Sequence, residues 1–227
     1  MTKVIAYKRD QWANATAELL VEKFHEILSV KDGCSVLLTG GDTAMELYKN
    51  ISMLPLFTQL KNVNFYLGDE RFDVEFGGEL NSKKISENLF RDGVPDGCNF
   101  FPIFNLGDNL EDSLNRYKSI YPGQIDVMIF TVGLDGHIAS IFPEDREVMM
   151  SSDSYTISYS SNHRHTRVTI TPQEIKNAQC QFLLAIGGKK IEVIKKGIEE
   201  NDPLKYPFLH SRDIWILDEE LTGIFIQ

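Results

Sequence analysis

The feature that most restricts how this chain can fold is the alternation of short apolar, β-branched segments with longer segments of helical period. Such alternation is typical of a parallel sheet whose strands are connected by helices. Most of the predicted strands are apolar throughout, as strands covered on both faces tend to be. The predicted fold class is therefore α/β, with a mostly parallel, doubly wound (Rossmann-like) sheet and helices on both faces. Strands are predicted at residues 3–7, 35–39, 63–68, 125–132, 181–187 and 213–217.

Helices are predicted between these strands. Residues 12–28 place apolar side chains at spacings of three and four, which forms a stripe that faces a core. Pro172 opens a short helix, because proline suits the first helical position. Residues 155–160 and 167–171 alternate in character, and they form either an antiparallel addition to the sheet or a local hairpin. The other predicted helices are 43–51, 81–90, 110–120 and 189–198.

Length and composition favour one folded domain. The chain has 227 residues, of which 42% are hydrophobic, so it can bury a sizeable core. We expect a single domain spanning residues 1–227. The apolar stretches fall far short of the ~18 residues that a membrane span requires, and the N-terminus lacks the apolar region of a signal peptide. Since no membrane span is predicted, we expect no membrane partner. Three widely spaced cysteines form no CxxC pair, which indicates reduced thiols in a cytoplasmic protein.

The net charge argues against one class of partner. Lys and Arg number 23 and Asp and Glu number 33, which leaves a formal net charge of −10 at pH 7. Nucleic acids recruit basic surfaces, so we expect no nucleic-acid partner. A protein of this charge that binds an anion has to build a local positive pocket.

Ligands of open parallel sheets bind at the carboxyl ends of the strands, and four strand ends in this sequence carry unusual residues. At the first of them, Thr39, Gly40, Gly41 and Thr43 lead into a helix, where free backbone N–H groups favour an anion. The alternative is that the glycines serve only chain reversal, with Asp42 as the helix cap.

The second strand end carries the charged run Asp69, Glu70 and Arg71. Charge runs are usually solvated surface. This run directly follows an apolar strand, and an arginine fork suits a pair of phosphate or carboxylate oxygens, which favours a binding role. The acidic, glycine-containing segment 73–80 that follows is predicted to be a mobile surface loop that could close as a lid.

The third strand end contains a histidine. His137 directly follows Gly136 and lies two residues after Asp135, in the segment that follows the predicted strand 125–132. A lone histidine is more often structural than catalytic, but a group that titrates near neutrality is the natural proton acceptor at a strand end. Either Asp135 or Asp69 would orient the ring and select its tautomer.

The fourth strand end, at residues 187–190, places two lysines in the first turn of a helix. Cations there oppose the helix dipole, and an anionic ligand would compensate this cost, although Lys189 is better interpreted as solvent-exposed. The histidine-rich stretch 162–167 is interpreted as a loop entering a strand. Its two histidines at i, i+2 lack a carboxylate cluster, so we expect no metal site there. Arg167, at the start of that strand, could point into the crevice.

Together these motifs resemble the 6-phosphogluconolactonase family, within the group that also contains glucosamine-6-phosphate deaminases. The resemblance covers nearly the whole chain. Its most specific part is TVGLDGHIASIFP at 131–143, which resembles the family's GxGPDGHTASLFP. TGGDTA at 39–44 resembles an SGGSTP-type turn, and Asp69 to Arg71 with Asn81 resemble a DER motif and the asparagine that follows it. Residues 167–169 and 187–190 resemble the family's RIT strand and GxxK turn.

The resemblance implies hydrolysis of 6-phospho-D-glucono-1,5-lactone to 6-phosphogluconate in the pentose phosphate pathway, without metal or organic cofactor, in a NagB/RpiA-like fold. It implies that His137 is the general base, with Asp69 or Asp135 as its carboxylate partner, while N–H groups of the glycine turns stabilise the oxyanion. We expect a monomer or a weak homo-oligomer. The phosphorylated sugar lactone would be bound by Gly40, Gly41, Thr43, Arg71, Asn81, Gly136, Arg167 and Lys190.

Two alternatives stay open. Deaminases resemble the same motif but carry a glutamate five residues after the histidine, where this chain has Phe142, so the ring-opening proton relay lacks its carboxylate. The fold also occurs in effector-binding domains of transcriptional regulators, which makes a non-catalytic sugar-phosphate sensor the second alternative. The presence of His137 with two aspartates argues against a sensor. Asp42 stands where the family has serine, which leaves the role of that turn open.

Overall fold

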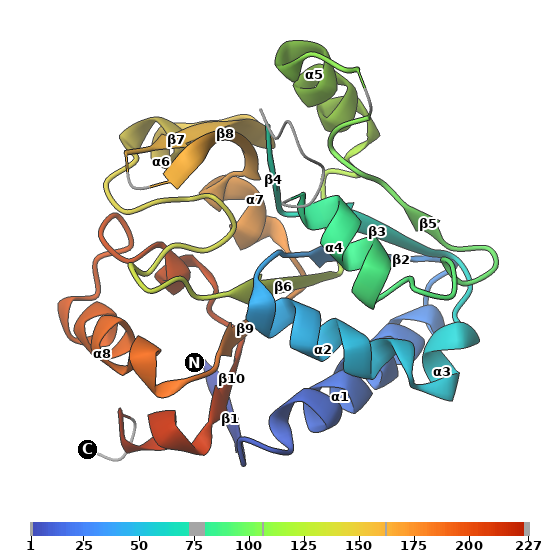
Figure 1. The fold of residues 1–227 in the computed structure, drawn as a ribbon, viewed down its shortest axis with the longest axis horizontal. Coiled ribbons are helices and arrows are strands. Elements are labelled where there is room, and N and C mark those ends of the chain that lie inside the picture. Colours follow the sequence, from blue (N-terminus) through green and yellow to red (C-terminus); the bar gives the residue numbers. More distant parts are fainter. Residues whose placement is uncertain (1, 73–79, 106, 162, 225–227) are drawn as a thin grey trace.

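The computed structural model describes residues 2–72, 80–105, 107–161 and 163–224. Within these residues the central element is a seven-stranded sheet in the order β1-β10-β9-β6-β2-β3-β5. Each neighbouring pair in it is parallel, which confirms the predicted α/β class (Figure 1). The strands are β1 Lys3–Tyr7, β2 Cys34–Leu38, β3 Val63–Leu67, β5 Asn99–Phe100, β6 Val127–Thr131, β9 Cys180–Ala185 and β10 Ile214–Asp218.

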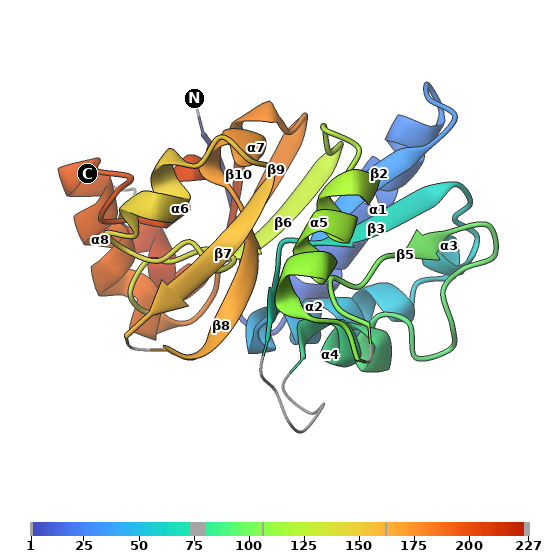
Figure 2. The same cartoon turned by 90° about the horizontal axis from the view of Figure 1, so that it is seen from above.

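Helices cover both faces of this sheet. Helices α1 (Trp12–Leu28) and α2 (Asp42–Ser52) pack against each other on one side, whereas α5 (Leu110–Ile120) lies on the other (Figures 1 and 2). The apolar stripe predicted for α1 is buried. The remaining helices are α3 Pro55–Thr58, α4 Asn81–Asn88, α6 Arg146–Met150, α7 Pro172–Asn177 and α8 Ile191–Glu200, with 3-10 turns at Gly188–Lys190, Pro207–His210 and Glu219–Ile224.

The core lies between the sheet and its helices. The ring of Phe65, in β3, packs against Phe90 at 5.2 Å, Phe57 at 6.3 Å and Phe24 at 6.5 Å between ring centroids. Strand β6 is buried from Val127 through Phe130. This agrees with the expectation that apolar strands of a parallel sheet are covered on both faces.

A second, antiparallel sheet in the order β4-β8-β7 contacts the carboxyl edge of the first. Strands β7 (Tyr155–Ser160) and β8 (His163–Ile170) form a hairpin, which settles the alternative that the sequence left open, and this hairpin does not join the central sheet. It pairs with β4 (Asp69–Arg71), the continuation of the chain after β3. Gly68 is the junction, because its N–H donates to the end of β2 and its carbonyl accepts from the end of β8, both at 2.8 Å.

The structure corrects one local prediction. The histidine-rich stretch is not a loop, since β8 already begins at His163. The reason is the tight closure of the hairpin, in which Ser160 pairs with His163 and draws the following residues into the strand. Asn162, and the predicted mobile segment 73–80 apart from Leu80, lie outside the described residues. In the described part of the chain, none of the helices combines the length and apolar character needed to cross a membrane.

Candidate active site

A small cavity lies where the carboxyl ends of β2 and β6 meet β4 and β8. Parallel strands end at one edge of their sheet, so segments that are distant in sequence converge there. Its lining residues are Thr39, Gly40, Gly41, Asp69, Arg71, Asn81, Thr131, His137, Ala139 and Arg167. Seven predicted site residues are therefore brought together, namely Gly40, Gly41, Asp69, Arg71, Asn81, His137 and Arg167. Four others are not among the described lining residues, namely Thr43, Asp135, Gly136 and Lys190.

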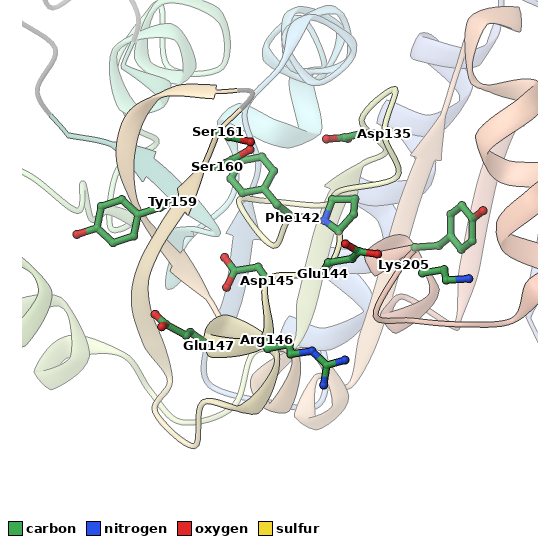
Figure 3. Close-up of a pocket in the computed structure, with 12 residues that line it drawn as sticks. Asp135, Phe142, Glu144, Asp145, Arg146, Glu147, Tyr159, Ser160, Ser161 and Lys205 are labelled. Carbon is green, nitrogen blue, oxygen red and sulfur yellow. The ribbon is translucent and has the colours of Figure 1, made fainter.

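A second pocket is a larger groove of about 800 Å³, whose lining residues are drawn in Figure 3. Phe142 belongs to the wall between them, because it lines the groove while its ring packs 5.1 Å from the ring of His137, measured between centroids. The groove carries the carboxylates of Asp135, Glu144, Asp145 and Glu147 against the two cations of Arg146 and Lys205. Such a surface repels a phosphorylated anion, so charge favours the smaller cavity as the candidate site.

His137 and Asp135 form a hydrogen-bonded pair in the loop after β6. Nδ1 of His137 lies 2.5 Å from Oδ1 of Asp135, and the backbone N–H of His137 donates to the same oxygen at 3.2 Å. Burial raises the pKa of the Asp135 carboxyl, but the hydrogen bonds and charge of His137 outweigh burial and hold this pKa well below its usual range. An ionised Asp135 keeps a proton on Nδ1 and leaves Nε2 as the proton acceptor. Of the two aspartates that the sequence left open, Asp135 contacts the ring.

Two glycines shape this loop. A Cβ atom on Gly133 would lie 2.2 Å from both Cε1 and Nδ1 of His137, so the ring occupies its place because residue 133 has no side chain. Gly136 has a φ of +91°, a conformation that favours glycine, and its carbonyl accepts from the N–H of Phe208 at 3.0 Å. Gly136, which the resemblance implied as a substrate contact, therefore shapes and anchors the loop and does not line the cavity.

Asp69 is held from two sides. Ser140 Oγ donates to Oδ2 of Asp69 at 2.6 Å, and Asn81 Nδ2 donates to Oδ1 at 3.2 Å and to the Asp69 carbonyl at 3.0 Å. Asn81 fills the space that Gly40 leaves, because a Cβ atom on Gly40 would lie 2.1 Å from Asn81 Oδ1. Asp69 is 4% exposed, and these contacts compensate the burial of its carboxylate.

Glu70 was not predicted as a site residue, although it lies between two that were. Its carboxylate is buried and accepts from the backbone N–H groups of Arg71, Asn81 and Ser82 at 2.9, 2.8 and 2.7 Å. Burial raises the pKa of this carboxyl, and the three N–H donors offset part of that effect. Glu70 thereby ties the end of β4 to the first turn of α4. The signal that could have revealed it is a carboxylate two residues after an apolar strand.

Arg71 and Arg167 lie directly opposite each other on two neighbouring strands of the second sheet. The register of β4 and β8 pairs these residues directly, and both line the cavity. Side chains directly opposite in an antiparallel pair project from the same face, where like charges repel. The carboxylate of Asp69, 3.8 Å from Nη1 of Arg167, offsets part of this repulsion. An anion bound between the two guanidinium groups would offset the rest, which makes the pair a candidate phosphate site.

Lys190 lies at the fourth predicted strand end, after β9, which is the neighbour of β6 in the sheet. Burial lowers the pKa of its ammonium group to about 8, and the Asp218 carboxylate offsets part of that effect. The N–H groups of Gly187 and Gly188 donate to the carboxylates of Asp218 and Glu220 at 2.6 and 2.9 Å. In this structure the anions bound by the turn are therefore carboxylates of the chain itself.

The turn after β2 begins α2. Gly41 has a φ of +95° and occupies the N-cap position, so Asp42 is the first helical residue and not the cap. Thr43 lies in the same first turn. The carbonyl of Gly40 accepts from Thr131 Oγ1 at 3.3 Å, which joins this turn to the end of β6. The first N–H groups of a helix have no partner within it, so this end of α2 can stabilise an oxyanion.

Together these features define the class of this protein, a doubly wound α/β protein. At the carboxyl edge of its sheet it presents a histidine–aspartate pair, a helix N-terminus and two facing arginines. Such a site suits a small anionic ligand held next to a proton acceptor.

The chain belongs to the family described as glucosamine-6-phosphate isomerases/6-phosphogluconolactonase, whose model matches residues 7–213. A 6-phosphogluconolactonase from Thermotoga maritima is 26% identical over 225 residues, which cover 96% of this chain and 99% of that protein. The crystal structure of a 6-phosphogluconolactonase from Shewanella baltica has a TM-score of 0.84 at 19% identity and covers 96% of this chain and 97% of that one. A monomeric glucosamine-6-phosphate deaminase has a TM-score of 0.79 at 18% identity, with 98% and 100% covered. The two structures share the fold of this chain.

The contact between Gly40 and Asn81 is testable through stability. We expect Gly40→Ala to lower the free energy of unfolding by about 1–3 kcal/mol, because the added methyl group collides with a buried side chain. Urea denaturation measures this change. The controls are Asn81→Ala and the double variant, which should lose less stability than the sum of the single variants, since removal of the amide makes room for the methyl group. Strict additivity would contradict the packing described.

Proposed function

We propose that this protein is a 6-phosphogluconolactonase, which hydrolyses 6-phospho-D-glucono-1,5-lactone to 6-phosphogluconate in the pentose phosphate pathway. The observation that carries the proposal is an imidazole, hydrogen-bonded to an ionised carboxylate, lining the same cavity as two cross-strand arginines. Membership of the family and the names of the relatives support this activity.

In the proposed mechanism His137 is the general base. The neutral ring carries its proton on Nδ1, toward Asp135, and Nε2 accepts a proton from a water molecule as the water oxygen attacks the lactone carbonyl carbon. The carbon–oxygen bond forms while the carbonyl electron pair moves onto its oxygen. N–H groups at the Gly40–Gly41 turn and the start of α2 stabilise the resulting oxyanion.

The tetrahedral intermediate then collapses and the ring carbon–oxygen bond breaks. The imidazolium of His137 returns its proton to the departing ring oxygen, which becomes a hydroxyl group of the product. The new carboxylic acid releases a proton to solvent near neutral pH, because an ordinary carboxyl pKa lies about three units lower. Asp135 stabilises the imidazolium between the two steps and keeps the ring oriented. The scheme forms no covalent bond between the protein and the substrate and uses no cofactor.

The phosphate of the substrate binds between Arg71 and Arg167 in this proposal. Two guanidinium groups present paired donors that suit phosphate oxygens, and the anion relieves their mutual repulsion. Lys190 does not line this cavity, so in this proposal it acts on the phosphate only through the electrostatic field of its charge, from the end of β9. Asn81, whose amide also holds Asp69, borders the same cavity.

The deaminase activity that occurs with this fold is a less suitable assignment. Its ring-opening relay needs a carboxylate at the position of Phe142. The Phe142 ring instead packs 5.1 Å from the His137 ring and 5.5 Å from the guanidinium carbon of Arg167. An apolar ring cannot relay a proton. A sensor without catalysis, the other alternative, would have no use for the ionised carboxylate that holds His137.

The general base is tested by substitution. We expect His137→Ala to lower kcat for lactone hydrolysis by about 10²- to 10⁴-fold without loss of the fold, the usual contribution of a positioned proton acceptor. Asp135→Asn should also lower kcat strongly, because the amide neither holds the proton on Nδ1 nor stabilises the imidazolium. Acid release from fresh lactone, corrected for spontaneous hydrolysis, measures both. Ammonia release from glucosamine 6-phosphate, or no acid release above background by the unaltered protein, would refute the proposal.

The phosphate site predicts a different kinetic signature for Arg71→Ala. Loss of one charge-assisted contact costs roughly 1.5–3 kcal/mol, so KM should rise about 10- to 100-fold while kcat changes little. The matched control is Arg91→Ala, because Arg91 is exposed, pairs with Asp92 and does not line the cavity. An unchanged KM for Arg71→Ala would contradict the assignment of the arginine pair.

Lys190 provides a pH test. Its pKa is lowered by burial to about 8, so the ammonium group is charged below that pH and is neutralised as the pH rises through it. We therefore expect the affinity for 6-phosphogluconate to fall above about pH 8, and Lys190→Arg to abolish this fall because the guanidinium pKa exceeds ~12. Calorimetry with the stable product avoids the spontaneous hydrolysis of the lactone. An affinity of the unaltered protein that is constant across this range would show that the charge of Lys190 does not act on the phosphate.

A further inference from the structure

Ser140 connects the loop that follows β6 with all three strands of the second sheet. It is 0% exposed. Its hydroxyl donates to Oδ2 of Asp69, in β4, at 2.6 Å and accepts from Nη1 of Arg167, in β8, at 3.3 Å. Its backbone N–H donates to Thr169 Oγ1, also in β8, at 3.1 Å, and its carbonyl accepts from Ser158 Oγ, in β7, at 2.6 Å. Four hydrogen bonds, two through the hydroxyl and two through the backbone, therefore hold Ser140 in place.

The hydroxyl stands between two opposite charges. Nη1 of Arg167 is 3.8 Å from Oδ2 of Asp69, which exceeds the ~2.7–2.9 Å of a direct charge-assisted hydrogen bond. Both side chains are nearly buried, where the attraction between unlike charges is stronger than in water. A serine hydroxyl can donate one proton and accept on a lone pair, so it can join the carboxylate to the guanidinium while keeping them apart.

We infer that Ser140 is a positioning residue of the anion site, which keeps Arg167 at the cavity opposite Arg71 by preventing its direct pairing with Asp69. Without the hydroxyl, the guanidinium would close onto the carboxylate, and the positive charge facing the cavity would be partly neutralised. The inference rests on the proposed function for the identity of the anion, the phosphate of the substrate.

The first test is Ser140→Ala, which removes the hydroxyl and leaves the Cβ atom. We expect its affinities for inorganic phosphate and for 6-phosphogluconate, measured by calorimetry without turnover, to fall about five- to twentyfold. KM for the lactone should rise by the same factor with little change in kcat, because the pair of His137 and Asp135 is unaltered. Ser140→Cys, which retains a weaker donor and acceptor, should give an intermediate affinity.

Ser158→Ala is the matched control. It deletes another buried hydroxyl, one that bonds to the carbonyl of Ser140 and to Asp145. We expect a similar loss of stability for the two alanine variants, with unchanged anion affinity for Ser158→Ala. Equal phosphate affinities of the two alanine variants would overturn the inference.

A second test separates positioning from packing. In an Asp69→Asn background the neutral amide attracts the guanidinium weakly, so the added effect of Ser140→Ala on phosphate affinity should fall below about twofold. A loss of the same size in both backgrounds would overturn the inference in favour of a packing role.

The two proposals fail in different ways. If the unaltered protein binds phosphate but does not hydrolyse the lactone, the proposed function fails, and the inference about Ser140 still stands on the binding data. If the unaltered protein hydrolyses the lactone and Ser140→Ala binds phosphate normally, the inference fails alone. If neither phosphate nor 6-phosphogluconate binds, the arginine pair is not an anion site and the inference fails as well.

Discussion

Burial of a carboxylate costs free energy that hydrogen bonds or opposite charges have to offset. Asp69 and Glu70, two consecutive buried carboxylates just after β3, impose this requirement on the segments around them. Glu70 accepts from three backbone N–H groups and thereby determines where α4 begins. Asp69 accepts from Ser140 and Asn81, which draws the loop after β6 and the start of α4 onto β4. The cavity forms where these segments meet, so its polar lining follows from the way in which the two charges are satisfied.

The charge of the site opposes the charge of the chain. A protein with a formal net charge of −10 places Arg71 and Arg167 together in the cavity, while the neighbouring groove carries four carboxylates against two cations. Acidic surroundings disfavour anions nearby, so a phosphorylated ligand is favoured at the arginine pair. The size of a pocket alone is therefore a poor guide to the ligand site in this protein. The groove is larger than the cavity, but its net negative charge disfavours a phosphorylated ligand.

Much of the architecture could be predicted because it depends on local patterns. Helix α1 ends at Leu28, as its period predicts, its apolar stripe is buried, and the apolar strands lie in the parallel sheet. The second sheet is harder to predict, because β4 is three residues long, polar and without a visible period. Ser140 lies within the motif at 131–143, but a serine after an alanine gives no sign of the partners that its hydroxyl contacts. Its importance comes from Asp69 and Arg167, both of which are far from it in the chain.

By itself the sequence determined which chemical groups stand at the ends of the strands, because strand periodicity, turn residues and a charged run after an apolar segment are all local properties. The tertiary structure alone decided that Asp135 contacts His137, that Arg71 lies opposite Arg167, and that Lys190 stands outside the lining of the cavity. These relations depend on the register of β4 against β8 and on the direction in which each loop leaves its strand. Both are set by packing between segments that no local pattern connects.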